Sequence, residues 1–109
     1  NSEVILFSIS WEQAKKNQEA GVFGIVLECI NETTAKKITN LIKIPTIGIG
    51  ASVYCDGQIL VTDDMLGLSG FYPKFVKKFV NLNNIIEIGV EKYKKAVLKR
   101  NFPSNKNKY

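Results

Sequence analysis

The sequence of 109 residues contains no histidine, and this absence limits the chemistry that its side chains can perform. Without imidazole, the chain has no histidine to activate a nucleophile, to act as a general acid or base, or to bind zinc. Carboxylates, lysines, hydroxyls and two cysteines remain for catalysis. With 45% hydrophobic and 23% charged residues, the composition indicates a globular domain rather than a disordered or fibrous protein.

Cysteine and long apolar runs are scarce as well. Cys29 and Cys55 form no C-x-x-C pair and are too few for a disulfide framework, so we expect ordinary thiols in a reducing, cytoplasmic environment. No apolar run reaches the roughly 20 residues that a membrane helix needs, so we expect no membrane partner. The N-terminal stretch VILFSIS lacks the basic flank and cleavage site of a signal peptide, and the first residue, Asn1, hints at a longer parent protein.

Arginine is nearly absent from a basic chain. The net charge is +5, yet Arg100 is the only arginine among 15 basic residues. Residues 1–70 carry a net charge of −3, whereas residues 71–109 carry +8. A basic half is compatible with nucleic-acid binding, but reading of bases and bidentate binding of phosphates favour arginine over lysine. We therefore expect no nucleic-acid partner.

The first half of the chain alternates between helix and strand signals. Ser10 and Gln13 fit a capping box that predicts a helix over residues 11–20, and Asn31 fits the cap of a second helix. The apolar runs VFGIVLE from Val22 and IPTIGIG from Ile44 predict two buried parallel strands, and a third run is expected over residues 58–62. Three strands are too few to close a barrel, so we expect residues 1–109 to be one segment of a larger α/β protein.

The second half is predicted to be mainly helical. The stretch DDMLGLSG is expected to be a loop, and Pro73 stands where a helix would begin. A last helix is predicted from about Ile85 to Lys99, with one apolar face, and the Asn- and Lys-rich tail of residues 101–109 is expected to fray.

Three groups of residues at the expected strand ends could carry chemistry. Glu28 ends a buried strand, where a carboxylate suits a general base, although it could equally cap the next helix. Gly48 and Gly50 could cradle an anion, and close packing would explain them equally well. Asp63 and Asp64 could bind Mg²⁺, but adjacent loop aspartates are more often solvated or capping.

Five motifs together resemble the C-terminal part of the ketopantoate (3-methyl-2-oxobutanoate) hydroxymethyltransferase family. They are AGVFGIVLECI from Ala20, IPTIGIGAS from Ile44, CDGQILV from Cys55, DMLGL from Asp64 and PKFVKKF from Pro73. The resemblance covers roughly residues 14–103 in consistent order and spacing. It implies a (β/α)8 TIM barrel of the phosphoenolpyruvate/pyruvate superfamily, of which this chain supplies about the last three strands and the C-terminal helices.

The resemblance also implies an activity and its participants. In the family, Mg²⁺ chelates the keto acid 3-methyl-2-oxobutanoate, its C3 proton is removed, and the enolate attacks the methylene group of 5,10-methylenetetrahydrofolate. The proton acceptor of the LEC motif corresponds to Glu28. Metal and keto-acid ligands are expected from earlier strands, so no metal ligand is assigned here. The family forms large homo-oligomers, and we expect a homo-oligomer or association with a missing N-terminal segment.

Some positions depart from the family pattern. Ser52 replaces the second glycine of GIGAG, Asp63 stands where a histidine commonly precedes the DMLGL motif, and the tail lacks the usual ending. These departures support a second interpretation, in which the chain is a non-catalytic remnant that acts as a structural or interaction module.

Overall fold

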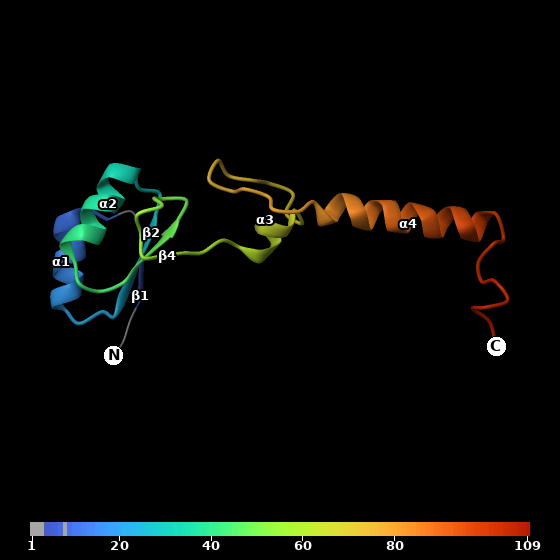
Figure 1. Ribbon diagram of the computed structural model, residues 1–109, viewed down its shortest axis with the longest axis horizontal. Coiled ribbons are helices and arrows are strands. Elements are labelled where there is room, and N and C mark those ends of the chain that lie inside the picture. The colour runs from blue at the N-terminus through green and yellow to red at the C-terminus, as the bar shows by residue number, and fades with distance from the viewer. Residues whose placement is uncertain (1–3, 8) are drawn as a thin grey trace. The chain divides into compact units, whose positions relative to one another are not determined.

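The computed structural model describes residues 4–7 and 9–109, which form two compact units. One unit spans the chain up to Val61 together with Tyr72–Val76, and the other comprises Thr62–Phe71 and Lys77–Tyr109. Figure 1 shows the elements in chain order: β1 (Val4–Phe7), α1 (Trp11–Glu19), β2 (Gly24–Glu28), α2 (Glu32–Leu41), β3 (Thr46–Ile49), β4 (Gly57–Gln58), α3 (Thr62–Leu66) and α4 (Leu82–Leu98).

The first unit is a parallel sheet with the strand order β1-β2-β3-β4. Helices α1 and α2 connect β1 to β2 and β2 to β3, pack on each other, and lie on the same side of the strands (Figure 1). This is the arrangement that right-handed crossovers produce when consecutive strands are also neighbours. The predicted α/β architecture with parallel strands is therefore confirmed.

Helices α1 and α2 both begin at a side-chain cap, which accepts a hydrogen bond from a backbone N–H of the first turn. The Ser10 hydroxyl accepts a hydrogen bond from the Gln13 N–H at 3.3 Å, and the Gln13 side chain accepts one from the Ser10 N–H at 2.9 Å, which completes a capping box. Asn31 accepts a hydrogen bond from the Thr34 N–H at 2.8 Å and caps α2. Both predicted caps are confirmed.

The core of this unit lies between the sheet and the two helices. Ile25 and Leu27 of β2 are fully buried against Ala14 of α1 and against Ala35 and Ile38 of α2. All of residues 24–27 are buried, which confirms the prediction of a strand covered on both faces.

The beginning of β3 is fixed by a polar cluster around Thr46, which has no exposed surface. The Asp56 carboxylate accepts hydrogen bonds from the Thr46 N–H at 2.9 Å and from the Thr46 hydroxyl at 3.2 Å. The Asp56 N–H in turn donates to the Thr46 hydroxyl at 3.3 Å, and the hydroxyls of Thr39 and Thr46 are 2.8 Å apart. The cluster ties α2, β3 and the start of β4 together and leaves the buried threonine fully hydrogen bonded.

The sequence-based assignment of strands was wrong in two respects. The sheet has four strands rather than three, because Val4–Phe7 pairs with β2 as β1. The run predicted as the third strand, residues 58–62, is extended and paired only at Gly57–Gln58, and Thr62 already begins α3. After β4 has paired with Ile47 and Gly48, the Ile59 N–H still donates to the Gly48 carbonyl at 3.0 Å, and β3 ends one residue later at Ile49.

The second unit contains α3 and α4 and differs from expectation in similar ways. Part of the DDMLGLSG stretch, expected to be a loop, is the short helix α3. Pro73, which belongs to the first unit, begins no helix: the Val76 N–H donates to the Pro73 carbonyl in an isolated turn. Helix α4 is present as predicted but begins at Leu82, because the Asn81 side chain accepts a hydrogen bond from the Asn84 N–H.

No residue of α4 is buried within the described part of the chain, so the apolar face predicted for this helix is exposed. Residues 101–109 form turns without helix or strand, and the Phe102 ring makes an edge contact with Tyr93 at 5.7 Å between ring centroids. Among the described helices, none combines the length and the apolar character that crossing a membrane requires.

We expect Asp56→Ala to lower the free energy of unfolding by about 1–3 kcal/mol, because it leaves the buried Thr46 N–H without its charged acceptor. Urea unfolding measures the change. Asp63→Ala is the control, since within the described residues its exposed side chain makes no hydrogen bond, and it should change stability by less than about 0.5 kcal/mol. Equal effects of the two substitutions would contradict the role assigned to Asp56.

Candidate functional site

The carboxyl ends of β2 and β3 form the edge at which the sequence places its candidate residues. Glu28, the last residue of β2, pairs in register with Ile49, the last residue of β3, and Gly50 follows directly. Because neighbouring parallel strands lie about 4.8 Å apart, the backbones at Glu28 and at the loop after β3 are close. The structure therefore places Glu28 and the GIGAS segment at the ends of neighbouring strands.

Glu28, the candidate base, is half-buried. Within the described residues it makes no hydrogen bond and no ion pair. The cap of α2 is Asn31, so the alternative in which Glu28 caps this helix receives no support from the geometry. Directly after Glu28, Cys29 adopts a φ of 54°, and this left-handed residue turns the chain out of the sheet toward α2.

The glycines of the GIGAS segment are required by close packing. Gly50 has a φ of +63°, and a Cβ atom built on it would lie 2.1 Å from the Cβ of Phe75. A Cβ atom on Gly48 would lie 3.0 Å from the Cys55 sulfur and 3.1 Å from the Gln58 side-chain oxygen. Of the two explanations for these glycines, the structure thus supports close packing.

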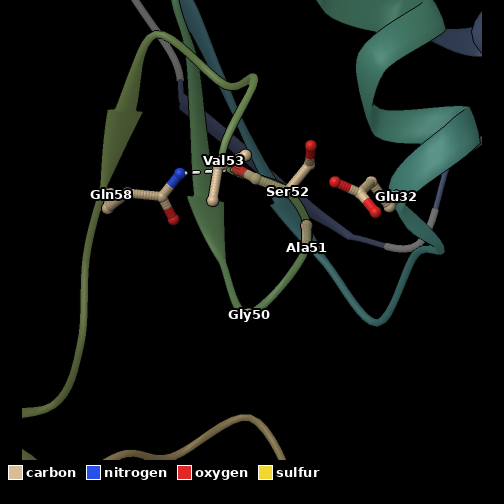
Figure 2. Close-up of a pocket in the computed structure, with 6 residues that line it drawn as sticks. All are labelled: Glu32, Gly50, Ala51, Ser52, Val53 and Gln58. Carbon is tan, nitrogen blue, oxygen red and sulfur yellow. Dashed lines mark hydrogen bonds between the residues drawn. The ribbon is translucent and has the colours of Figure 1, made fainter.

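A hollow of about 320 Å³ lies between the start of α2 and the loop that follows β3. Figure 2 shows the Glu32 carboxylate pointing from α2 toward Ser52, while Gln58 reaches the same loop from β4. Gln58 donates a hydrogen bond to the Ser52 carbonyl at 2.6 Å, and the Ser52 hydroxyl accepts one from the Tyr54 N–H at 3.1 Å. The lining residues are Glu32, Gly50, Ala51, Ser52, Val53 and Gln58.

Sequence reasoning did not single out Glu32 and Gln58, which line the hollow. Glu32 could have been found, because it is the first residue after the Asn31 cap and so lies near the end of the preceding strand. Gln58 carries no comparable signal, since its place in the hollow depends on the pairing of β4 with β3.

Asp63 and Asp64 do not follow a strand end as expected: β4 ends at Gln58, and the two aspartates lie in the first turn of α3, in the second unit. The Asp64 carboxylate accepts a hydrogen bond from the Ser69 hydroxyl, and the Asp63 carbonyl accepts one from the Leu68 N–H at 2.8 Å. Over residues 4–7 and 9–109, no three His, Cys, Asp or Glu side chains gather as metal ligands. The described residues alone therefore do not fit the octahedral oxygen shell that Mg²⁺ prefers.

Residues 8–105 match the family described as ketopantoate hydroxymethyltransferase. The chain is similar to proteins named 3-methyl-2-oxobutanoate hydroxymethyltransferase from several bacteria. The relative from Pelagibacter ubique (strain HTCC1062) is 47% identical over 98% of this chain and 42% of its own length. Those from Clostridium botulinum (strain Langeland) and Anaplasma marginale (strain Florida) are 54% and 52% identical, each over 90% of this chain and 36% and 35% of their own lengths. The chain thus spans about two fifths of the relatives it matches.

We expect Gly50→Ala to lower the free energy of unfolding by about 2 kcal/mol or more, because alanine is disfavoured at positive φ and its methyl group would overlap Phe75. Thermal or urea unfolding tests this. Gly70→Ala is the control, since a Cβ atom there meets nothing within 4 Å, and it should change stability by less than about 1 kcal/mol. A harmless Gly50→Ala would show that Phe75 does not pack on this loop.

Proposed function

Since this chain belongs to the ketopantoate hydroxymethyltransferase family, we propose that it supplies the proton-abstracting base for hydroxymethyl transfer to 3-methyl-2-oxobutanoate, and that this base is Glu28. The product is ketopantoate, an intermediate of pantothenate synthesis. The observation that carries the proposal is a half-buried carboxylate at the end of a buried parallel strand, without a partner in the described part of the chain.

The fold supports this reading. Active sites of parallel α/β proteins lie at the carboxyl ends of the strands, which is where Glu28 stands. The strand order shows no reversal, and α1 and α2 cover the same side of the sheet (Figure 1). A doubly wound sheet would reverse its order and place helices on both faces, so we propose that these strands are part of a (β/α)8 barrel.

A carboxylate without a hydrogen-bond or ion-pair partner can accept a proton, and this is the first step of the proposed reaction. Glu28 takes the C3 proton of the keto acid, and the electron pair left behind forms the enolate. Water adds to the methylene carbon of 5,10-methylenetetrahydrofolate as its two C–N bonds break, which releases tetrahydrofolate. C3 of the enolate forms a bond to this carbon, and the oxygen taken from water accepts a proton and becomes the hydroxyl group. Ile25 and Leu27 pack against α1 and α2, and this packing holds the strand that positions Glu28.

The proposed reaction also uses Mg²⁺, whose ligands we do not assign to this chain. Because the described residues gather no ligand set for Mg²⁺, we place its ligands in the part of the relatives that this chain does not span.

The test uses a restored enzyme, in which this chain replaces the matching segment of the Pelagibacter relative. We expect Glu28→Gln to lower the rate of hydroxymethyl transfer by about 10² to 10⁴, because glutamine keeps the shape but cannot take a proton. Deuterium exchange at C3 of the keto acid isolates the proton transfer and should fall equally, while keto-acid affinity stays the same.

Glu19→Gln is the control, since it changes an exposed carboxylate at the end of α1, and it should leave both rates unchanged. Parental exchange and turnover in Glu28→Gln would rule Glu28 out as the base. A folded restored enzyme without any exchange would favour the interpretation of a non-catalytic remnant.

A further inference from the structure

We propose that the hollow between α2 and the loop after β3 binds the pterin ring of the one-carbon donor, with the Glu32 carboxylate accepting hydrogen bonds from the N–H edge of the ring. This inference rests on the proposed function, because it assigns one of the two substrates of that reaction to a place on this chain.

The hollow lies at the edge of the sheet where β2 ends at Glu28, although Glu28 does not line it. Its wall, residues 50–53, begins one residue after Ile49, which pairs in register with Glu28. Glu32 begins α2, only four residues after Glu28. The enolate formed beside Glu28 must meet the methylene carbon within van der Waals distance, so the donor ring needs a binding surface at this edge of the sheet.

Glu32 forms no ion pair with Lys36, the lysine that follows it by four residues on α2. Lys36 stands one helical turn after Glu32, the spacing and order that favour an ion pair on a helix. The Lys36 ammonium instead lies 4.0 Å from the centre of the Tyr54 ring. Within the described residues Glu32 has no ion pair, and Figure 2 shows its carboxylate pointing across the hollow toward Ser52.

The negative charge of Glu32, an exposed residue in the first turn of α2, distinguishes between the two substrates. The keto acid carries a carboxylate, which Glu32 would repel, and none of the residues that line the hollow is basic. The pterin ring is neutral and presents an amino group beside a ring N–H, two parallel donors that match the two oxygens of a carboxylate. The hollow is therefore suited to the donor, and the keto acid is held elsewhere.

The loop after β3 has backbone N–H groups that can donate hydrogen bonds to the pterin ring. The backbone N–H groups of Ala51 and Val53 have no hydrogen-bond partner among the residues that the structure describes, and the ring carbonyl next to the N–H edge can accept from such groups. The Val53 side chain is 82% exposed at the rim, where it can cover a flat ring. Gln58 and Phe75 hold the loop in place through Ser52 and Gly50.

The test measures the affinity of the restored enzyme for tetrahydrofolate by calorimetry, so that it needs no turnover. Glu32→Gln should weaken tetrahydrofolate binding about 10- to 100-fold, because a charge-assisted pair of hydrogen bonds is lost, and should leave keto-acid affinity unchanged. Glu12→Gln is a matched control, since Glu12 stands in the first turn of α1 as Glu32 does in α2, and it should bind tetrahydrofolate like the parent.

Unchanged tetrahydrofolate affinity in Glu32→Gln would overturn the inference, as would weaker binding of the keto acid instead. Deuterium exchange at C3 of the keto acid separates this failure from that of the proposed function. If exchange persists in the parent while Glu32→Gln binds tetrahydrofolate normally, the subsite is wrong and the proposed function stands. If the folded parent shows no exchange, the proposed function itself fails.

Discussion

The parallel pairing of β2 with β3 brings Glu28 and Gly50 to the same edge of the sheet. It places Glu28 opposite Ile49, so that the loop after β3 and the turn into α2 begin at the same edge of the sheet. The other end of β3 is fixed by Asp56, which holds Thr46 through both its backbone and its hydroxyl. A slip of one residue in this register would turn each side chain of β3 to the opposite face and would move Gly50 away from Glu28.

Four acidic residues differ in whether the described residues give them a hydrogen-bond partner. Asp56 and Asp64 are engaged, by Thr46 and by Ser69, and these bonds account for their presence. Glu28 and Glu32 have no such partners in the described part of the chain, although Asn31 and Lys36 stand nearby and are occupied with other groups. Glu32 lies in the first turn of α2, where a negative charge also favours the helix N-terminus. The roles proposed for Glu28 and Glu32 therefore rest on their place at one edge of the sheet, beside the hollow.

Features set by local interactions could be predicted from the sequence, and features set by distant contacts could not. The caps at Ser10 and Asn31 and the buried strand that ends at Glu28 follow from neighbouring residues, and the structure has them. The strand Val4–Phe7 was missed because a run of four residues becomes a strand only through its pairing with β2. The role of the glycines could not be decided because Phe75, which packs on Gly50, lies far along the chain. The position of Glu32 after the Asn31 cap could be predicted, but its lack of an ion pair could not, because it depends on Lys36 lying over the ring of Tyr54.

The central claim is that Glu28 faces the carbon that loses its proton. A crystal structure of the restored enzyme with 3-methyl-2-oxobutanoate tests it most directly, through the distance from the Glu28 carboxylate oxygens to C3 of the keto acid. The account predicts a separation of about 3 to 3.5 Å, the range of a reacting pair. A keto acid whose C3 lies beyond about 6 Å from Glu28, or closer to another carboxylate, would contradict it, because a general base must come within hydrogen-bond reach of its proton.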